Sequence, residues 1–553
     1  MKKTIALISL LLALITAHAQ SLQTAAKRPE TLKSLKQLGL IWGFLKYYHP
    51  SVTSGSYNWD KELFSILPAV MNAGDAAKRD AVFMKWIDGL GPVTETTYPK
   101  ANEVKLEPDL KWIQQSGFSE ALSALLTKVA QAKRPEISYY MEKYPGVGNP
   151  IFKNETAYDS LSFPVDEVRL LTLFRYWNMI QYYYPYKYLA APWMEILDEF
   201  LPKYLSNTSE KEYVLTTLEL IGKVNDTHAN IWNQPASLVQ FRGANTAAPI
   251  VSSVEDRAVI TGFYNDSLGA LSGMKPGDVI TAVNGLPVND IIKAKLNYTP
   301  ASNYATKLRD IAMGLLRSND PELNIEFERD HKTLKQTLTT YPQKLVSPSG
   351  IFQRKDTCFR MLTPDIGYLY LGSVKSAYLP AIFKALGSAK GLVIDLRCYP
   401  SEFIVFTLGK YLFPKPTAFV RFTMNSIQQP GLFTFTPPIT VGQRYSDRFK
   451  GKIIILVNEL SQSQAEYTAM AFRTALKALV VGSTTAGADG NVSAIALPGN
   501  IKTAISGIGV YYPDKKETQG SGIIPDVEIR PTIAGIREGK DELVDKAIEL
   551  INK

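Results

Sequence analysis

The pattern of apolar positions changes twice along the chain. Through residue 246, apolar side chains recur at the three- and four-residue spacing that is typical of helices. From about residue 247, β-branched runs and frequent turns replace this spacing, and from about residue 343 short apolar strands alternate with helical stretches. The sequence therefore predicts a multidomain α/β protein with a helical domain (20–246), a β-rich module (247–342) and an α/β core (343–553).

The helical part contains one aromatic segment twice. Residues 42–50 read WGFLKYYHP and residues 177–185 read WNMIQYYYP, with the same spacing. Because proline cannot continue the hydrogen-bond ladder of a helix, the proline that closes each segment predicts a helix end. A tryptophan and a helical apolar pattern follow each copy, at Trp59 and Trp193. We expect two related helical units whose aromatic residues pack between helices; a binding surface is the alternative.

The N-terminus has the three parts of a secretory signal peptide. Lys2 and Lys3 precede an uncharged apolar stretch over 5–15, and residues 17–19 read Ala-His-Ala. The apolar stretch is shorter than the ~20 residues that a membrane-spanning helix needs. We expect residues 1–19 to be removed and the mature protein to be periplasmic or secreted, without a transmembrane segment.

Charge and cysteine content say little about the class of protein. The formal charge of +9 comes from 61 basic and 52 acidic residues, which are scattered instead of forming the basic stripe of a nucleic-acid binder. No nucleic-acid partner is expected. The two cysteines, Cys358 and Cys398, are too few to staple a chain of 553 residues, so they either form one disulfide or are buried as thiols.

The β-rich module contains a turn-rich string at 270–285, ALSGMKPGDVITAVNG. It combines a helix-ending glycine, a Pro-Gly-Asp turn, a short strand and an Asn-Gly turn. This string resembles the PDZ domain of the bacterial type. The resemblance implies a groove that binds an extended peptide as an added strand, with Gly277 and Asp278 as substrate-binding residues. A PDZ-shaped spacer that binds nothing is the alternative.

The segment 452–471 carries the main candidate for chemistry. It reads KIIILVNELSQSQAEYTAMA and predicts a buried strand, a polar turn and a helix. A serine at such a turn projects its hydroxyl beyond the strand end, where the free N–H groups of the helix can stabilise an oxyanion. Ser463 and Glu466 also form a Ser-x-x-Glu capping box, which begins many helices without any chemistry. This segment alone leaves both interpretations open.

Several segments of the last third occur in the order of one peptidase family. They are IGYLYL at 366–371, GLVIDLR at 391–397, the turn with Ser461, Ser463 and Glu466, VVG at 480–482 with a Thr-rich turn after it, and GSGIIPD at 520–526. With the PDZ-like string and the export signal, they resemble the C-terminal-processing (tail-specific) and tricorn-like serine peptidase family. The resemblance implies a crotonase-like α/β spiral core and Ser463 as the nucleophile.

The bases of that family are missing from their usual places. The tail-specific branch has a lysine where this chain reads STTAGADG (483–490), and the tricorn-like branch has a histidine where this chain has Tyr370. The leading candidate base is His228, because its NDTHAN segment is similar to an Asp-x-His element before the PDZ module, in which Asp226 can fix the tautomer. A structural His–Asp hydrogen bond is the alternative. His331, in a charged run, is expected to be a solvated turn residue.

The same resemblance suggests the remaining members of the site. Glu517 is a candidate for the acid of a relay, with Gln519 nearer the family position, although Glu517 also fits a charged hairpin tip. The oxyanion donors are expected to be the N–H group of Gln464 and that of Ser401 or Tyr399, since the proline between these last two has none.

These expectations combine into an exported serine peptidase that cleaves polypeptides through an acyl-enzyme on Ser463. A catalytically inactive relative that binds peptides or scaffolds a cell-envelope assembly is the first alternative, and hydrolysis of a non-peptide acyl bond is the second. The sequence has no His-Glu-x-x-His, Cys-x-x-Cys, phosphate-loop or dinucleotide motif, so no metal or organic cofactor is expected.

Overall fold

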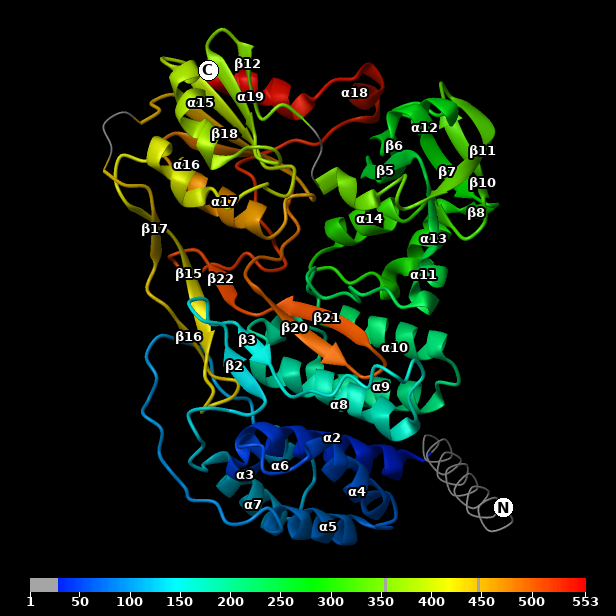
Figure 1. Cartoon of the computed structure of the whole chain (residues 1–553), viewed down its shortest axis with the longest axis vertical. Helices are drawn as coiled ribbons and strands as arrows, with labels where there is room; N and C mark the ends of the chain where they lie inside the picture. The colour runs from blue at the N-terminus through cyan, green and yellow to red at the C-terminus, as the bar shows by residue number, and fades with distance from the viewer. Residues whose placement is uncertain (1–27, 353–355, 445–447) are drawn as a thin grey trace.

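The structure is a computed structural model that describes residues 28–352, 356–444 and 448–553. The predicted signal peptide at 1–19 lies outside the described residues. Figure 1 shows the helical domain at the bottom, the α/β core at the upper left and the β-rich module at the upper right. The protein is therefore multidomain with mixed α/β structure, as the sequence predicts.

Two long helices organise the helical domain. α2 (Pro29–Tyr48) and α8 (Asp166–Tyr183) each end two residues before the proline that closes an aromatic segment. Proline stops both helices because it lacks the N–H group that would continue the ladder. The shorter elements are α3 (Pro50–Thr53), α4 (Trp59–Met71), α5 (Ala76–Asp88), α6 (Trp112–Gln115), α7 (Glu120–Ala130), β2 (Met141–Lys143), β3 (Pro150–Phe152), α9 (Trp193–Ser206), α10 (Glu210–Gly222) and α11 (Ala236–Arg242).

Both aromatic segments make the same tryptophan contact. Trp42 Nε1 donates to Trp59 O at 3.0 Å, and Trp59 Nε1 donates back to Trp42 O at 2.9 Å. Trp177 and Trp193 form the same reciprocal pair at 2.8 and 3.1 Å. Buried indole N–H groups need such partners, so the pairs tie α2 to the first residue of α4 and α8 to the first residue of α9. The four tryptophans are buried and contribute to packing rather than to an exposed surface.

α2 and α8 approach closely at two glycines of α2. A Cβ atom on Gly43 would lie 1.8 Å from Asn178 Cγ, and one on Gly39 would lie 2.4 Å from the ring of Phe174. The short distance between the helices lets Asn178 Nδ2 donate a hydrogen bond to Gly39 O at 3.0 Å. Because both positions of α2 are glycine, α2 and α8 can pack this closely.

The β-rich module is built on an eight-stranded sheet with the order β5-β6-β7-β10-β11-β4-β9, in which β8 also pairs with β7. β5 (Pro249–Val254) is an edge strand, and α14 (Tyr304–Met313) packs beside it. The other elements are β4 (Asn245–Ala247), β6 (Arg257–Phe263), α12 (Asp266–Leu271), β7 (Val279–Val283), β8 (Leu286–Pro287), α13 (Val288–Lys295), η2 (Leu296–Tyr298), β9 (Arg317–Ser318), β10 (Glu322–Arg329) and β11 (Lys332–Pro342).

The α/β core is built on a six-stranded sheet with the order β12-β13-β14-β18-β19-β23, parallel from β13 to β23. Its central strands are buried, as expected where helices cover both faces. Because these strands are parallel, the loops after β14, β18 and β19 meet at one edge. The strands are β12 (Phe359–Thr363), β13 (Ile366–Tyr370), β14 (Gly391–Asp395), β18 (Lys452–Val457), β19 (Ala478–Gly482) and β23 (Val527–Glu528), and the helices are α15 (Leu379–Leu386), α16 (Val405–Leu412), α17 (Gln464–Phe472), α18 (Ile533–Glu538) and α19 (Glu542–Asn552).

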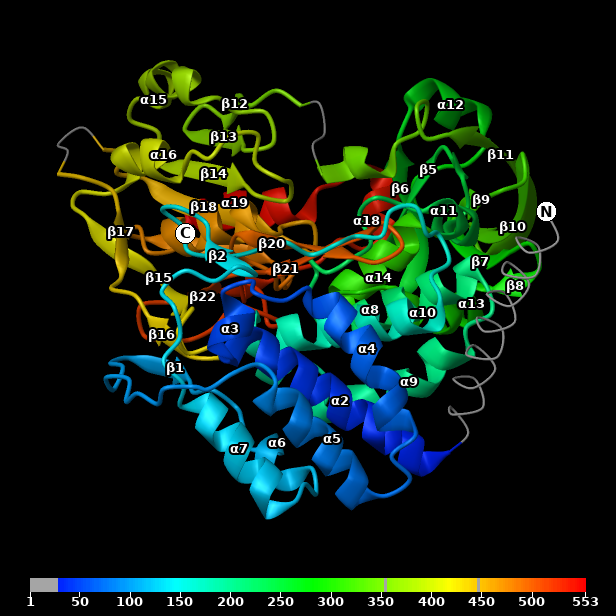
Figure 2. The same ribbon diagram turned by 60° about the horizontal axis from the view of Figure 1, so that its bottom comes forward.

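The two ends of the chain share one hydrophobic core. β20 (Val492–Leu497) and β21 (Ile501–Ser506) form a hairpin that lies along α8 in Figures 1 and 2, and its Ile495 and Ile505 belong to the buried cluster of the helical domain. The helical domain in turn gives β1 (Val104–Leu106) to the sheet of β15 (Thr417–Asn425), β16 (Phe433–Phe435), β17 (Ile439–Val441) and β22 (Gly509–Tyr511). Residues 492–506 therefore complete the core of the helical domain, although they lie within the predicted α/β core (343–553).

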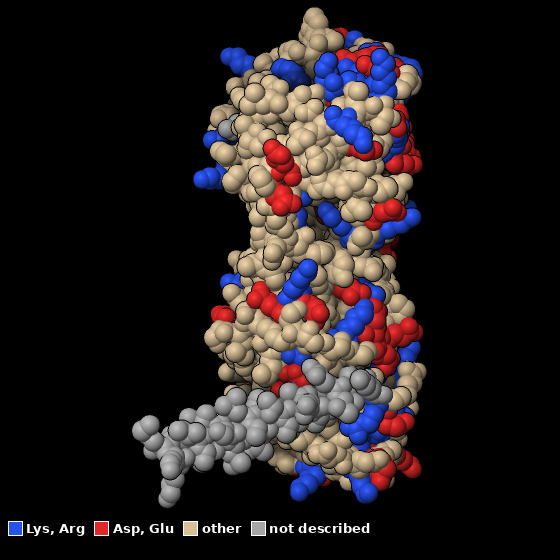
Figure 3. Space-filling model, turned by 90° about the vertical axis from the view of Figure 1, so that its right-hand side faces the viewer, with Lys and Arg blue, Asp and Glu red and all other residues tan. Residues whose placement is uncertain are grey.

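The structure shows how charged side chains are distributed on one face and whether the two cysteines pair. Basic and acidic side chains are interspersed over the face shown in Figure 3, whose outline narrows at mid-height. No helix within the described ranges is long and apolar enough to cross a membrane. Cys358 and Cys398 form no disulfide; Cys398 is buried and Cys358 is partly exposed.

Candidate active site

Ser463 stands between β18 and α17 in an unusual backbone conformation. Its φ of 56° and ψ of −114° lie outside the regions that residues with a side chain normally adopt. Such a conformation costs about 1–3 kcal/mol and persists only where its surroundings hold it in place. The sharp turn that presents a nucleophilic serine between a strand and a helix is one well-known use of this strain. This strained turn occurs together with the Ser-x-x-Glu capping box of Ser463 and Glu466.

The turn at 485–488 holds Ser463 in this conformation. The N–H group of Ser463 lies 3.0 Å from Ala488 O and 3.1 Å from Glu466 Oε2. The buried Glu466 carboxylate also accepts from Thr485 Oγ1 at 2.5 Å and from the N–H groups of Gly487 and Ala488 at 2.8 and 3.1 Å. Burial raises the pKa of Glu466, while these hydrogen bonds oppose the rise. Glu466 therefore locks the helix start to the neighbouring turn.

The N–H groups expected at the oxyanion site differ in availability. The N–H group of Gln464, at the start of α17, donates to no acceptor within the described ranges. The N–H group of Ser401 donates to Leu371 O at 3.0 Å, and that of Tyr399 donates to Phe352 O at 2.7 Å. Only the donor from Gln464 is therefore open in this structure, and a second donor requires one of the other two contacts to break.

His228 is held on one side of its ring. Its Nδ1 lies 2.9 Å from Ser506 Oγ, and Ser506 Oγ donates to Asp226 Oδ1 at 3.0 Å. Asp226 is fully buried and accepts further bonds from the N–H groups of His228 and Ser506, at 3.0 and 2.6 Å. The Nε2 atom of His228 makes no hydrogen bond with any described residue.

These bonds define the tautomer of His228. An ionised carboxylate only accepts hydrogen bonds, so the single hydroxyl proton of Ser506 points to Asp226. The Ser506 oxygen is then an acceptor, and the proton between Ser506 and His228 belongs to Nδ1. Burial lowers the pKa of His228, and the charge of Asp226 partly opposes this. His228 is therefore neutral near pH 7, with the lone pair of Nε2 able to take up a proton.

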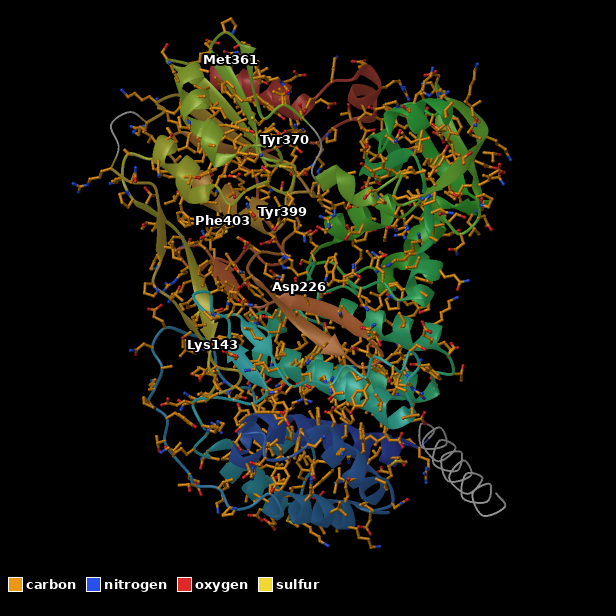
Figure 4. The ribbon with its side chains drawn as sticks, viewed as in Figure 1. Lys143, Asp226, Met361, Tyr370, Tyr399 and Phe403 are labelled. Carbon is orange, nitrogen blue, oxygen red and sulfur yellow. The ribbon has the colours of Figure 1, made fainter. Side chains whose placement is uncertain are left out.

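Residues next to His228 and Ser463 in the chain contact the same turn and line the same cavity. Thr227 Oγ1 donates to Ala486 O at 3.2 Å, within the same turn that binds the N–H group of Ser463. A cavity of about 580 Å³ is lined by Thr227 and Gln462, the residues before His228 and Ser463. In Figure 4, Asp226 lies in the middle of the molecule, where the helical domain meets the core.

Comparison with known proteins identifies the core. Residues 365–529, which include β13 to β23 and Ser463, match the model of peptidase family S41. The chain carries a peptidase family S41 domain. This confirms the family resemblance of the sequence. No curated protein matches this chain.

Solved structures with a similar fold match this chain beyond residues 365–529. Mature CPAF complexed with lactacystin has a TM-score of 0.56 and 16% sequence identity, covering 70% of this chain and 99% of CPAF. Mature CPAF alone has a TM-score of 0.54, with 16% identity and coverage of 70% and 98%. A photosystem II D1 C-terminal processing protease has a TM-score of 0.41, 16% identity and coverage of 67% and 96%. The likeness to CPAF shows a shared fold over most of this chain.

Glu517, the acid expected from the sequence, makes none of the contacts described for His228. Its carboxylate accepts from the hydroxyl of Tyr188 and lies 3.6 Å from Lys105 Nζ. Gln519, which the sequence places nearer the family position, donates from Nε2 to Asp226 Oδ1 at 3.3 Å. The carboxylate next to the histidine is therefore that of Asp226.

The two substrate-binding residues expected in the β-rich module have structural contacts. Asp278 is buried, and its carboxylate accepts from Arg329 Nε and Nη2 at 2.7 and 2.6 Å. Gly277 adopts a φ of 87°, and a Cβ atom there would lie 2.9 Å from Arg537 Cβ of α18. These residues hold the module together and against α18, so a direct contact with substrate would require these contacts to open.

Proposed function

We propose that this S41 protein is an exported serine peptidase that cleaves polypeptides through an acyl-enzyme on Ser463. The observation that carries the proposal is the strained conformation of Ser463. The residue before it, Gln462, lines a cavity that is also lined by Thr227, the residue before His228. A serine hydroxyl is a weak nucleophile until a base removes its proton, so the base decides whether this geometry is active.

In the proposed reaction, His228 supplies the base that the family positions lack. Its Nε2 takes the proton of the Ser463 hydroxyl as the Ser463 oxygen attacks the substrate carbonyl. Asp226, acting through Ser506, stabilises the imidazolium that forms, and the N–H group of Gln464 stabilises the oxyanion. The imidazolium then gives its proton to the leaving amine, and water releases the acyl group by the same steps in reverse order.

The β-rich module is proposed to act as a PDZ domain. β5 pairs with a strand on one side only and has α14 beside it, which is the arrangement that an added peptide strand requires. Backbone hydrogen bonds to β5 would hold an extended substrate while its cleavage site reaches Ser463. Export follows from the signal-like residues 1–19 and is proposed on the sequence alone.

One observation favours a second candidate, a peptidase-like protein that binds peptides without cleaving them. The N–H groups of Tyr399 and Ser401 already have carbonyl partners, which leaves the oxyanion site with a single open donor. Loss of one such donor typically lowers the rate about 10²- to 10³-fold. The two candidates differ in whether Ser463 reacts at all.

A fluorophosphonate probe tests the proposal on the mature chain, residues 20–553. We expect the probe to label the wild type at Ser463 and to leave Ser463→Ala unlabelled. His228→Asn is expected to slow labelling roughly 100-fold or more, because positioned general bases contribute about 10²- to 10⁴-fold. His331→Asn is the matched control, since His331 lies on an exposed turn and its loss leaves labelling unchanged.

Each contrary result has a distinct meaning. Absence of labelling at any pH from 5 to 9 would favour the non-cleaving candidate. Labelling that His228→Asn leaves at the wild-type rate would remove His228 as the base while keeping Ser463 as the nucleophile.

A further inference from the structure

Asp226 is a buried carboxylate without a lysine or arginine partner. It is fully buried, and no described lysine or arginine side chain forms an ion pair with it. Neutral donors meet its charge instead: the N–H group and hydroxyl of Ser506, the N–H group of His228 and the side-chain amide of Gln519. Because a buried charge is costly unless hydrogen bonds compensate it, these donors decide where the carboxylate group lies.

Gln519 reaches Asp226 from the loop after β22. Its Nε2 donates to Asp226 Oδ1 at 3.3 Å, and the same oxygen accepts from the hydroxyl of Ser506 at 3.0 Å. The amide must turn its NH₂ group toward the carboxylate, because the reverse orientation would place two acceptors in contact. Gln519 Oε1 therefore needs a donor from another residue. This oxygen is buried and has no hydrogen-bond partner among the described residues.

Two tyrosine hydroxyls near this carboxylate also have no partner. Tyr176 belongs to α8 and Tyr184 caps its C-terminal end; both are buried, and neither hydroxyl forms a hydrogen bond within the described ranges. Burial raises the pKa of both tyrosines, and the charge of Asp226 raises it further. At Tyr184 a contact with Gln519 opposes the rise, although this contact falls short of regular hydrogen-bond geometry. Tyr184 is thus placed to supply the donor that Gln519 Oε1 lacks.

Another tyrosine of α8 separates the effect of burial from that of Asp226. Tyr182 is as buried as Tyr184, and its hydroxyl likewise has no partner in the described part of the chain. It packs its ring against that of Tyr48 at a centroid distance of 5.6 Å, and the charge of Asp226 does not act on it. What distinguishes Tyr184 is therefore its place beside Asp226 and not its burial.

We propose that Tyr184 and Gln519 are positioning residues of the base, in a chain in which the Tyr184 hydroxyl donates to Gln519 Oε1 and Gln519 Nε2 donates to Asp226. The proposal rests on the peptidase function, because it deepens the role proposed for His228. The chain holds Asp226 Oδ1 where it accepts from Ser506, which in turn accepts the Nδ1 proton of His228. Hydrogen bonds in such a chain polarise one another, so a change at one end is felt at the other. The second aromatic segment then serves the site as well as the helical core.

Nuclear magnetic resonance of the imidazole nitrogens measures the base itself. The mature chain, residues 20–553, contains three histidines, His49, His228 and His331, so labelling with nitrogen-15 histidine gives three rings to assign. We expect the wild-type His228 ring to carry its proton on Nδ1 near pH 7. Gln519→Met keeps the length of the side chain and removes its N–H donors. It should shift the tautomer ratio of His228 roughly 3- to 10-fold toward the form protonated at Nε2, the effect of about one hydrogen bond.

Fluorophosphonate labelling of Ser463 measures the consequence for reactivity. Tyr184→Phe and Gln519→Met are each expected to slow labelling roughly 3- to 10-fold. Because Tyr184 acts through Gln519, the double variant should be no slower than Gln519→Met alone. Tyr182→Phe is the matched control and should leave both the labelling rate and the tautomer ratio unchanged.

Several outcomes would overturn the proposal. These are an unshifted tautomer ratio in Gln519→Met, additive effects of the two substitutions on labelling, and equal slowing by Tyr182→Phe and Tyr184→Phe. A lower melting temperature with an unchanged tautomer ratio would likewise reduce Gln519 to a structural role. The tautomer ratio does not depend on any reaction of Ser463. A shifted ratio without labelling of Ser463 would keep the positioning chain and reject the peptidase, whereas labelling with an unshifted ratio would do the opposite.

Discussion

Nδ1 of His228 lies 2.9 Å from the hydroxyl oxygen of Ser506, a residue 278 positions further along the chain. This contact joins the end of the helical domain to the last residue of β21. It gives the histidine ring one fixed side and leaves Nε2 for another proton partner.

Replacement of Ser506 tests whether this contact serves catalysis. Ser506→Ala removes the acceptor of the Nδ1 proton, so the ring no longer favours the tautomer with a free Nε2. We expect the rate of fluorophosphonate labelling to fall roughly 10- to 100-fold, because removal of a tautomer-fixing partner lowers catalysis strongly. Ser493→Ala is the control, since Ser493 is a buried serine of the same hairpin that contacts Asn149. A lower melting temperature with an unchanged labelling rate would instead indicate a purely structural role.

The pH dependence of labelling reports the charge state of His228. Only the neutral ring can act as a base, and burial lowers its pKa below the ordinary value near 6.5. The rate should therefore rise with pH through a midpoint below the ordinary value for histidine and level off above it. In Asp226→Asn the midpoint should move further down, because the charge that raises the pKa of His228 is lost, and the plateau rate should also fall.

Glu517 offers the comparison for this experiment. Glu517→Gln changes a carboxylate that contacts Tyr188 and Lys105, so we expect the midpoint to stay in place. If Glu517→Gln shifted the midpoint and Asp226→Asn did not, Glu517 would be the acidic partner of the base.

Close packing of α2 on α8 predicts a sensitive glycine. A methyl group at Gly43 would overlap the side chain of Asn178, and overpacking of a core typically costs about 1–3 kcal/mol. We expect Gly43→Ala to lower the free energy of unfolding by this amount in urea denaturation. Gly222→Ala, at the end of α10, is the control, because a Cβ atom there would meet its nearest neighbour at an ordinary 3.5 Å. Equal stability of the two variants would contradict the packing described for Gly43.

Patterns in the sequence predicted those parts of the candidate site whose residues are close together in the chain. The strand, turn and helix around Ser463 follow from a buried apolar run and a polar interruption, and the Asp-x-His spelling was enough to pair Asp226 with His228. The S41 resemblance came from the order of several such segments.

Contacts between distant segments could not be predicted in the same way. Nothing in the alternating apolar pattern of 501–506 marks Ser506 as the partner of a histidine, because periodicity gives the face of a strand and not its neighbour. Likewise, the N–H group of Tyr399 donates to the backbone carbonyl of Phe352. A bond between two backbone groups has no signature in the sequence.

The hairpin of β20 and β21 has a consequence for how the chain is made. Ile495, Leu497, Ile501 and Ile505 belong to the core of a domain whose helices begin at residue 29. During synthesis that core stays incomplete until the ribosome has passed residue 505, almost the whole length of the protein. Any fragment that stops earlier lacks the hairpin that packs on α8. The nascent chain is thus kept from completing its first domain while it is still short, a delay that would suit the export proposed for this protein.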